Sequence, residues 1–363
     1  MSEARRIRVR TPSRSYDVLV GRDLLDGVGR LTREACGGRR ACVVSDSNVA
    51  PLYANAVEES LADAGYECTA QAFEAGEGSK NMGTLADLLE GLARAGLDRD
   101  DVVIAVGGGV TGDIAGLAGA MYLRGCKVVQ VPTSLLAMVD SSVGGKTAVD
   151  LSAGKNLAGF FFQPHLVIAD VDCLDTLTPS LFTDSCGEVI KHAAIADAEL
   201  LARLGEEPIN AQGYDRGRLV EVIARNVRIK RDVVERDERE GGLRQVLNFG
   251  HTIGHAVEAA SSFELGHGSS VAVGMCCIAR ASAARGWCTQ DVADRIVSAV
   301  DAYGLPTGTD IDHRTIVSFA AHDKKRHGAG VNVVTPRALG AVEVRHVTLA
   351  ELAELVELGC APA

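Results

Sequence analysis

The first half of the chain alternates short apolar runs with longer segments of helical spacing. The continuous runs at 102–106, 128–131 and 166–169 are rich in β-branched residues and predict strands buried on both faces. Weaker strand patterns occur at 7–9, 18–20, 41–45 and 67–73, and helical patterns occur at 51–64 and 82–95. This alternation predicts an α/β region with a Rossmann-like, mostly parallel sheet flanked by helices.

The pattern changes near residue 178, after which apolar residues recur mainly at helical spacing. Helices are predicted at 189–204, 218–235, 252–260, 271–285 and 290–303. A chain of 363 residues is long for one domain. We therefore expect an α/β domain at 1–178 and a mainly α-helical domain at 179–363.

Composition narrows the choice of partner. The net charge of −11 and the aromatic content of 4% argue against a nucleic-acid partner. The ten cysteines include no C-x-x-C pair, which is typical of a reducing compartment. The first residues carry arginines but no apolar signal segment, and the apolar run at 102–123 contains Asp113. We expect a cytoplasmic protein that binds no membrane.

A glycine-rich turn follows the apolar run at 102–106. In VVIAVGGGVTGD, Gly107, Gly109 and Gly112 fit G-x-G-x-x-G, a turn that lets backbone N–H groups reach a pyrophosphate. The acidic residue expected about 20 positions later is replaced by Lys127. Cofactor contact and tight packing are therefore both open for this turn.

A second glycine-rich segment, DSSVGGKTAVDLSAGKN, is not a P-loop, because Asp140 occupies the position of the first required glycine. It nevertheless places Asp140, Lys146, Lys155 and Asn156 among glycines. Lysines in such a segment can hold a phosphate or carboxylate, although a solvated loop is the simpler interpretation for any one of them.

Histidines cluster in the second half. NFGHTIGH places His251 and His255 at i and i+4, on one face of a helix, and His267 follows in GHG. A carboxylate is a natural further ligand for a metal held by two histidines, and Glu188 in GEVIKH is a candidate. The spacing leaves open which two histidines bind a metal and which acts as a base.

Several of these blocks in this order resemble the 3-dehydroquinate synthase family. They are GGGVTGDIAGLAGAMYLRG, QVPTSLLAMVDSSVGGKTAVDLSAGKNLAGFFFQP, GEVIK and NFGHTIGH…GHG, and the resemblance runs from Asp46 to Lys325. It implies conversion of 3-deoxy-D-arabino-heptulosonate 7-phosphate to 3-dehydroquinate and phosphate. The steps would be transient oxidation by NAD, phosphate elimination, re-reduction and intramolecular aldol closure. The resemblance further implies a place in the shikimate pathway to aromatic amino acids, zinc or cobalt, and a homodimer.

The resemblance also implies roles for individual residues. It assigns the metal to Glu188, His251 and His267, and proton transfer to His255 and Glu240. It assigns NAD to Asp46, Asn48, Glu77, Lys80, Gly108, Gly109, Asp113, Thr133, Ser134, Lys155 and Thr176. It assigns the substrate to Arg124, Asp140, Lys146, Asn156, Lys191, Lys230, Arg244, Asn248 and one of Lys324 and Lys325.

Five positions depart from the common family pattern. Ser134 replaces a second threonine, and Cys186-Gly187 replaces a bulkier residue followed by alanine. Asp184 lies where the pattern has an asparagine at the NAD, and Ser269 where glutamate is frequent. These departures put cofactor affinity and local packing in question, but not the class of chemistry.

Three alternatives remain beside this interpretation. A metal-dependent polyol dehydrogenase would release NADH, and a related cyclase would act on a sugar phosphate without a carboxylate. A metal-stabilised nucleotide-binding protein would need no His255. The cations Arg124, Lys146, Lys230 and Arg244 favour a doubly anionic substrate. If the segment is helical, Asn248 lies one turn from Arg244, and together they suit a carboxylate.

Overall fold

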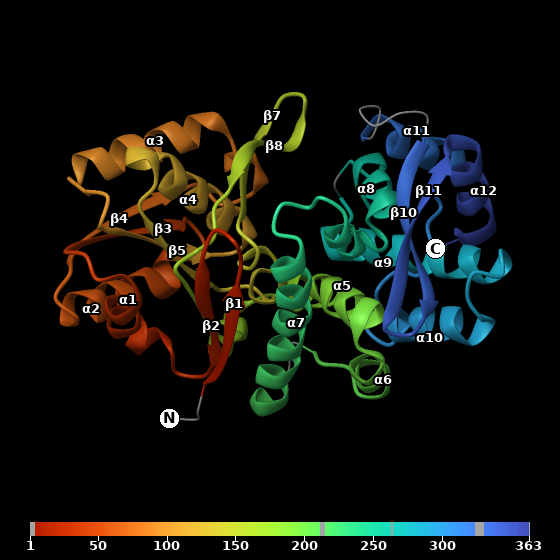
Figure 1. Cartoon of the computed structure of the whole chain (residues 1–363), viewed down its shortest axis with the longest axis horizontal. Helices are drawn as coiled ribbons and strands as arrows, with labels where there is room; N and C mark the ends of the chain where they lie inside the picture. Colours follow the sequence, from red (N-terminus) through yellow and green to blue (C-terminus); the bar gives the residue numbers. More distant parts are fainter. Residues whose placement is uncertain (1–3, 211–214, 263, 324–329, 363) are drawn as a thin grey trace. The chain divides into compact units, whose positions relative to one another are not determined.

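The computed structural model describes residues 4–210, 215–262, 264–323 and 330–362 (Figure 1). The chain forms two compact units. The first combines Met1–Thr176 with Asp215–Glu238, and the second combines Leu177–Tyr214 with Arg239–Ala363.

A seven-stranded sheet forms the centre of the first unit, in the order β1-β2-β9-β6-β5-β3-β4. Its strands are β1 (Arg5–Arg10), β2 (Ser15–Gly21), β3 (Arg40–Asp46), β4 (Glu67–Phe73), β5 (Val102–Gly107), β6 (Lys127–Pro132) and β9 (Leu166–Asp170). Only the pairing of β1 with β2 is antiparallel among the strand pairs of this sheet in the described residues. The predicted mostly parallel sheet is therefore confirmed.

Helices cover both faces of this sheet (Figure 1). Val102 and Ile104 of β5 pack with α1 (Val28–Cys36) and α2 (Asn55–Asp63). Val103 and Ala105 pack with α3 (Met82–Arg94) and α4 (Gly109–Met121). Burial on both faces explains why β5 is apolar at every position. Short helical turns complete the unit: η1 (Leu25–Gly27), η2 (Ala50–Ala54), η3 (Glu77–Ser79), η4 (Tyr122–Arg124), η5 (Ala137–Ser141) and η6 (Val171–Thr176).

The second glycine-rich segment forms a β-hairpin, which the sequence pattern did not predict. Its strands are β7 (Lys146–Leu151) and β8 (Gly154–Phe161), paired antiparallel. Gly145 has a φ of 67°, a left-handed conformation that turns the chain into β7. Along β7, the buried Thr147 and Val149 alternate with more exposed neighbours, which is the period of a strand packed on one face.

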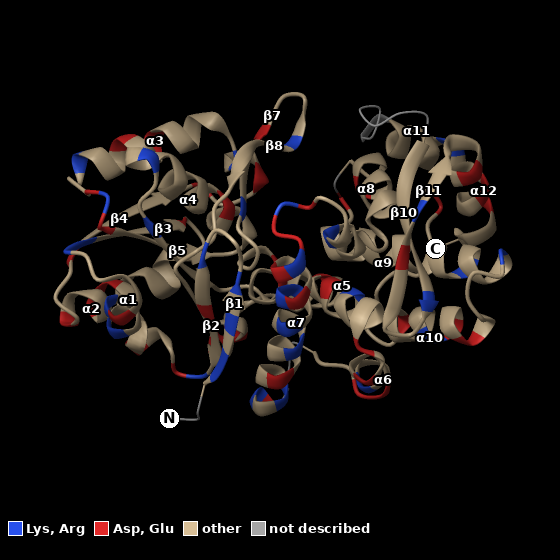
Figure 2. Ribbon diagram, in the orientation of Figure 1, with Lys and Arg blue, Asp and Glu red and all other residues tan. Residues whose placement is uncertain are grey.

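The long helix α7 (Arg216–Arg236) belongs to the first unit, whereas the sequence pattern placed every residue after 178 in the second domain. An ion pair and a hydrogen bond connect α7 to the first unit. Lys230 Nζ lies 2.8 Å from Asp140 Oδ1, and Glu235 accepts a hydrogen bond of 2.6 Å from the backbone N–H of Arg10. Figure 2 shows both signs of charge along α7. Helical periodicity says nothing of which unit a helix joins, so this correction required tertiary contacts.

The second unit is mainly helical, as predicted. Its helices are α5 (Pro179–Ala196), α6 (Ala198–Glu206), η7 (Leu243–Asn248), α8 (His251–Ala260), α9 (His267–Ala284), α10 (Gln290–Asp301), α11 (His313–Asp323) and α12 (Leu349–Gly359). The apolar α9 is central and packs against α5, α8, α10 and α12. The hairpin of β10 (Gly330–Ala338) and β11 (Ala341–Thr348) was not predicted. In the described part of the chain, no helix has the length and apolar character needed to span a membrane.

Candidate active site

The candidate metal ligands come from three helices of the second unit. Glu188 lies within α5, His251 is the first residue of α8 and His267 is the first residue of α9. His255 lies one turn after His251, so the predicted i, i+4 arrangement is present. Gly250 precedes α8 with a φ of 80°, a conformation that favours glycine and turns the chain sharply into the helix.

Glycines allow these helices to approach closely. A Cβ atom on Gly187 of α5 would lie 2.2 Å from the carbonyl oxygen of Gly268 on α9. A Cβ atom on Gly274 of α9 would lie 2.0 Å from the carbonyl oxygen of the residue before α8. A larger residue at either position would push the helices apart. Because Glu188 follows Gly187 and His267 precedes Gly268, this contact brings carboxylate and imidazole together.

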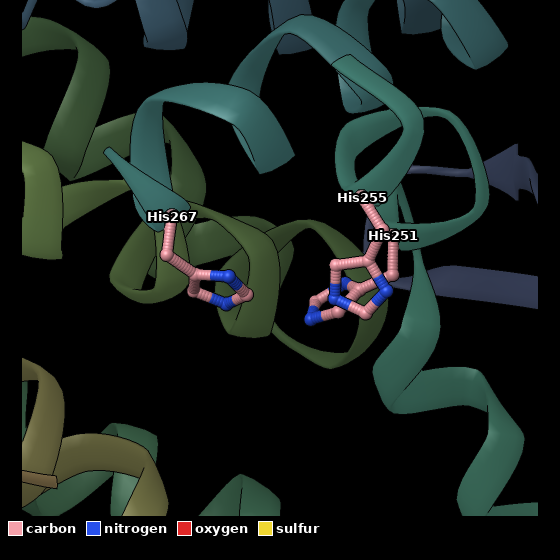
Figure 3. A group of neighbouring side chains, drawn as sticks. All are labelled: His251, His255 and His267. Carbon is pink, nitrogen blue, oxygen red and sulfur yellow. The ribbon is translucent and has the colours of Figure 1, made fainter. Parts of the chain in front are cut away.

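Glu188 lies between the two candidate histidine ligands. Its Oε1 is 3.4 Å from Nε2 of His251 and 3.4 Å from Nε2 of His267, and its Oε2 pairs with the ammonium of Lys191. The carboxylate is 1% exposed. Figure 3 shows the histidine side chains extending from α8 and α9 toward a common space. One carboxylate oxygen and two imidazole nitrogens suit zinc or cobalt, so these residues fit a divalent cation.

His255 is exposed and completes the histidine cluster. Its ring centroid is 5.1 Å from that of His251 and 5.7 Å from that of His267. One nitrogen from each ring lies within 4.8 Å of the others, so a three-histidine site is also geometrically open. The contacts of Glu188 with His251 and His267 favour the set that includes the carboxylate, and they leave the exposed His255 accessible to a substrate.

The surroundings of the two candidate ligands differ. Burial and the ammonium of Lys191 hold the pKa of His251 well below its ordinary value, so its ring is neutral near pH 7. Burial also lowers the pKa of His267, but hydrogen bonds with Glu188 and Glu258 outweigh burial and raise it to about 10. A proton on His267 thus balances the nearby carboxylates in the metal-free protein, and a bound cation would replace that proton.

In the first unit, the predicted glycine-rich turn connects β5 to α4. A Cβ atom on Gly107 would lie 2.5 Å from Thr111, so packing favours glycine there, and a Cβ atom on Gly112 would lie 2.8 Å from the end of the Gln130 side chain, which would have to move. A Cβ atom on Gly108 would lie 3.6 Å from its nearest neighbour. Gly108 is also only half-buried, so the start of α4 is partly exposed there, and a pyrophosphate could accept hydrogen bonds from its backbone N–H groups.

Asp46 lies at the end of β3 and is buried. Its Oδ2 accepts a hydrogen bond of 2.8 Å from the hydroxyl of Thr111, which fastens β3 to α4. Its Oδ1 accepts from the backbone N–H groups of Asn48 and Val49, at 3.0 and 3.1 Å. The carboxylate therefore shapes the turn beside the glycine-rich loop, and its contact with NAD stays a prediction.

Lys80 connects residues assigned to NAD and to the substrate. Its Nζ lies 2.6 Å from Asp113 Oδ2 and 2.6 Å from Asn156 Oδ1. Burial lowers the pKa of Lys80, but the carboxylate of Asp113 outweighs burial and raises it. The ammonium therefore stays charged and holds Asn156 of the hairpin beside α4.

The other assigned residues of the first unit have varied surroundings. Lys146, Lys155, Arg124 and Glu77 are exposed. Thr133 is buried after β6, and Ser134 accepts a hydrogen bond from the backbone N–H of Ala137 at 3.3 Å. The hydroxyl of Thr176 lies 2.6 Å from that of Tyr53. Lys230 pairs with Asp140, so both residues assigned to the substrate have a protein partner.

In the second unit, Arg244 is 1% exposed and belongs to the 3₁₀ helix η7. A 3₁₀ helix has three residues per turn, so Asn248, four positions on, does not lie directly above Arg244. The spacing of an α-helix therefore does not apply to this pair, and their joint binding of a carboxylate stays a prediction. Glu240 lies in the preceding loop with a φ of 60°. Lys324 and Lys325 lie outside the described residues.

Comparisons with known proteins identify the family of this chain. Family models of the 3-dehydroquinate synthase N-terminal and C-terminal regions match residues 70–184 and 185–326. A 3-dehydroquinate synthase of Geobacter sp. strain M21 is 42% identical over 98% of this chain and 99% of the relative. The chain belongs to the 3-dehydroquinate synthase family.

Solved structures related to this family show the same fold. One is 2-deoxy-scyllo-inosose synthase with carbaglucose-6-phosphate, NAD⁺ and Co²⁺, with a TM-score of 0.89 and 25% identity, covering 98% of this chain and 100% of that one. Another is 2-epi-5-epi-valiolone synthase from Streptomyces hygroscopicus subsp. jinggangensis 5008 with NAD⁺ and Zn²⁺. Its TM-score is 0.83 at 28% identity, covering 95% of this chain and 96% of that one.

Two departures from the pattern of the 3-dehydroquinate synthase family contact each other. Asp184 accepts hydrogen bonds from the backbone N–H groups of Gly268 and Ser269 at 3.1 and 2.8 Å, and from the Ser269 hydroxyl at 2.7 Å. Asp184 thereby holds the first turn of α9. A glutamate at position 269 would bring a second carboxylate beside Asp184 and repel it. Serine at 269 instead donates a hydrogen bond to Asp184, so the two departures are compatible with each other. At a third departure, Gly187, the backbone lies close to Gly268.

Two residues that the sequence pattern did not assign shape the site: Asp184, which holds the start of α9, and Glu258, which contacts His267. The one signal for Glu258 was its position seven residues after His251, which places it on the same face of α8 two turns later.

Proposed function

We propose that this protein is a 3-dehydroquinate synthase, a carbon–oxygen lyase that converts 3-deoxy-D-arabino-heptulosonate 7-phosphate to 3-dehydroquinate and phosphate. The observation that carries the proposal is the donor group of Glu188, His251 and His267, at 3.4 Å contacts, in a chain 42% identical to a named synthase over almost its whole length. The fit of these donors to zinc or cobalt supports NAD-linked oxidation of a ring alcohol.

The second unit would supply the cation site and a proton-transfer group. Glu188, His251 and His267 hold the cation, and Lys191 fixes the second oxygen of Glu188. When bound, NAD supplies reversible hydride transfer and the divalent cation supplies acidification of the alcohol and polarisation of the resulting ketone. The exposed His255 accepts or donates a proton at the substrate.

The first unit would bind the cofactor and part of the substrate. The start of α4 receives the pyrophosphate of NAD, with Lys80 and Asp113 beside it. Lys146 supplies an exposed ammonium for the phosphate, and Asn156 is held by Lys80. In the second unit, the guanidinium of Arg244 suits the substrate carboxylate, because its fork can make two parallel hydrogen bonds.

The proposal is tested by incubating metal- and NAD-loaded protein with the heptulosonate phosphate. We expect phosphate release and carbocycle formation with no net accumulation of NADH, because each hydride removed is returned. Stoichiometric NADH formation would instead identify a polyol dehydrogenase. Cyclisation of sedoheptulose 7-phosphate or glucose 6-phosphate as fast as that of the heptulosonate phosphate would identify a cyclase of sugar phosphates that lack a carboxylate.

We also propose that the enzyme is a cytoplasmic homodimer, by analogy with the family. Light scattering of the purified protein, at several concentrations, tests the dimer. Fractionation of cells that express the chain tests the location.

A further inference from the structure

Each candidate histidine ligand has a second contact on the side of the ring that faces away from Glu188. For His251, Nε2 is 3.4 Å from Glu188 and Nδ1 is 3.2 Å from the backbone carbonyl oxygen of Phe249. For His267, Nε2 is 3.4 Å from Glu188 and Nδ1 is 3.3 Å from Oε2 of Glu258. Both rings therefore direct Nε2 toward the candidate cation and Nδ1 toward an oxygen acceptor.

This arrangement matters because a neutral imidazole carries one proton and one lone pair. An acceptor at Nδ1 holds the proton there and leaves the lone pair on Nε2 for a cation. For His251, the acceptor that holds the proton on Nδ1 is a backbone group, the carbonyl oxygen of Phe249. For His267 the acceptor is a side chain, and a carboxylate also makes the imidazole a better donor.

We propose that Glu258 is a positioning residue of the cation site, which accepts the Nδ1–H of His267 and so directs Nε2 of that ring toward the bound metal. The inference rests on the proposed metal site and deepens it. In this role Glu258 acts through His267, and not directly on the cation or the substrate.

The position of Glu258 supports this role. It lies on α8 seven residues after His251, so it faces the same side as that ligand, and it is 9% exposed. Its contact partner is the first residue of the neighbouring helix, α9, where the backbone is already held by Asp184. Asp184 thus fixes the backbone directly after His267, at Gly268 and Ser269, while Glu258 would fix the rotation and the tautomer of the His267 ring.

The test measures metal binding without turnover. Wild type, Glu258→Gln and Glu258→Ala are stripped of metal and titrated with Zn²⁺ against a chromophoric chelator, and with Co²⁺ while the visible absorption of the bound ion is recorded. Removal of such a partner weakens metal binding by about 10–100-fold. We expect a loss in that range for Glu258→Ala, a smaller loss for Glu258→Gln because its amide oxygen can still accept the Nδ1–H, and a changed Co²⁺ spectrum in both.

Glu354→Gln is the matched control, since it removes a carboxylate of the same unit that makes an exposed ion pair with Arg285. It should retain wild-type metal affinity and spectrum. The Tm of each metal-free variant and its affinity for NAD separate loss of ring positioning from loss of the fold. The partial rescue by Gln and the spectrum are readouts that a purely structural role of Glu258 would leave unchanged.

The outcomes distinguish the two proposals. Wild type that binds neither Zn²⁺ nor Co²⁺ overturns the metal site itself. Wild type that binds them, with unchanged affinity and spectrum in Glu258→Gln and Glu258→Ala, overturns the role of Glu258 and leaves the metal site standing. If Glu354→Gln weakens metal binding as much as the Glu258 variants do, the proposed role of Glu258 is also overturned. If Glu258→Ala does not fold, the Co²⁺ spectrum and affinity of Glu258→Gln decide.

Discussion

The three clustered histidines have different surroundings, and these suggest different roles. The His251 side chain is 14% exposed with Nε2 near Glu188, and burial and the nearby Lys191 lower its pKa. His267 lies between two carboxylates. His255 is exposed. At the scale of single residues, two histidines have the surroundings of metal ligands and one has those of a group that meets the substrate.

His251→Ala and His255→Ala are therefore expected to differ. His251→Ala removes a nitrogen 3.4 Å from Glu188 and should lose bound zinc on dialysis. His255→Ala should keep the metal but lose turnover, because general acid–base groups contribute about 10²–10⁴-fold. Metal analysis and steady-state kinetics check both. Equal loss of metal in the two variants would show that the ligands are wrongly assigned.

Arg244 is expected to set the preference for an acid substrate. Arg244→Lys keeps the charge but loses the two-point geometry. A lost charge-assisted hydrogen bond is worth about 1.5–3 kcal/mol, so kcat/KM should fall at least about tenfold. The wild type should strongly prefer the heptulosonate phosphate to sedoheptulose 7-phosphate, and metal content should not change. Unchanged turnover of the heptulosonate phosphate by Arg244→Lys would contradict the assignment of Arg244 to the substrate carboxylate.

At the scale of elements, the site depends on the contact between α5 and α9. Gly187 and Gly268 allow the two backbones to approach, and Asp184 holds the first turn of α9. Both features lie within a few residues of Glu188 and His267, so the same packing that stabilises the helix pair also sets the distance between these two candidate ligands.

Gly187→Ala is expected to disturb this contact. Its Cβ atom would lie 2.2 Å from the carbonyl oxygen of Gly268, and overpacking of this kind costs about 1–3 kcal/mol. Zinc affinity should fall with stability, because the helices must separate. Gly205→Ala in α6 is the control: its Cβ would make ordinary contacts of 3.7 Å, and helix propensity should stabilise it by roughly 0.5–1 kcal/mol. Denaturant unfolding and zinc titration measure both, and a fully stable Gly187→Ala would refute the contact.

At the scale of the whole molecule, the candidate cofactor residues divide between the two units. The glycine-rich turn, Lys80 and Asp113 belong to the first, and the metal donors belong to the second. The division follows from the fold, because the carboxyl ends of parallel strands offer helix N-termini to a pyrophosphate, whereas packed helices offer side chains to a cation.

Chelation is therefore expected to separate the two functions. Removal of the metal should abolish turnover, and added zinc or cobalt should restore it. The metal-free protein should still bind NAD with near-normal affinity, as measured by a fluorescence titration. Full activity without metal would contradict the proposed chemistry, and loss of NAD binding would contradict the assignment of separate residues to the two cofactors.

The sequence by itself determined the sheet, most of the helices and the pairing of His251 with His255. These features are set by periodicity, because a strand buried on both faces must be apolar throughout and residues four apart on a helix share a face. The resemblance to the family also assigned Glu188 and His267 to one metal site, and Oε1 of Glu188 lies 3.4 Å from Nε2 of His267 in the structure.

Only the tertiary structure decided which distant residues meet. It placed α7 with the first unit through Lys230 and Glu235, formed the β7–β8 hairpin, and made the segment of Arg244 a 3₁₀ helix. It also brought Glu258 to His267. The physical reason is that local patterns record which face of an element is buried, whereas its partner is chosen by close packing and charge contacts between segments far apart in the chain.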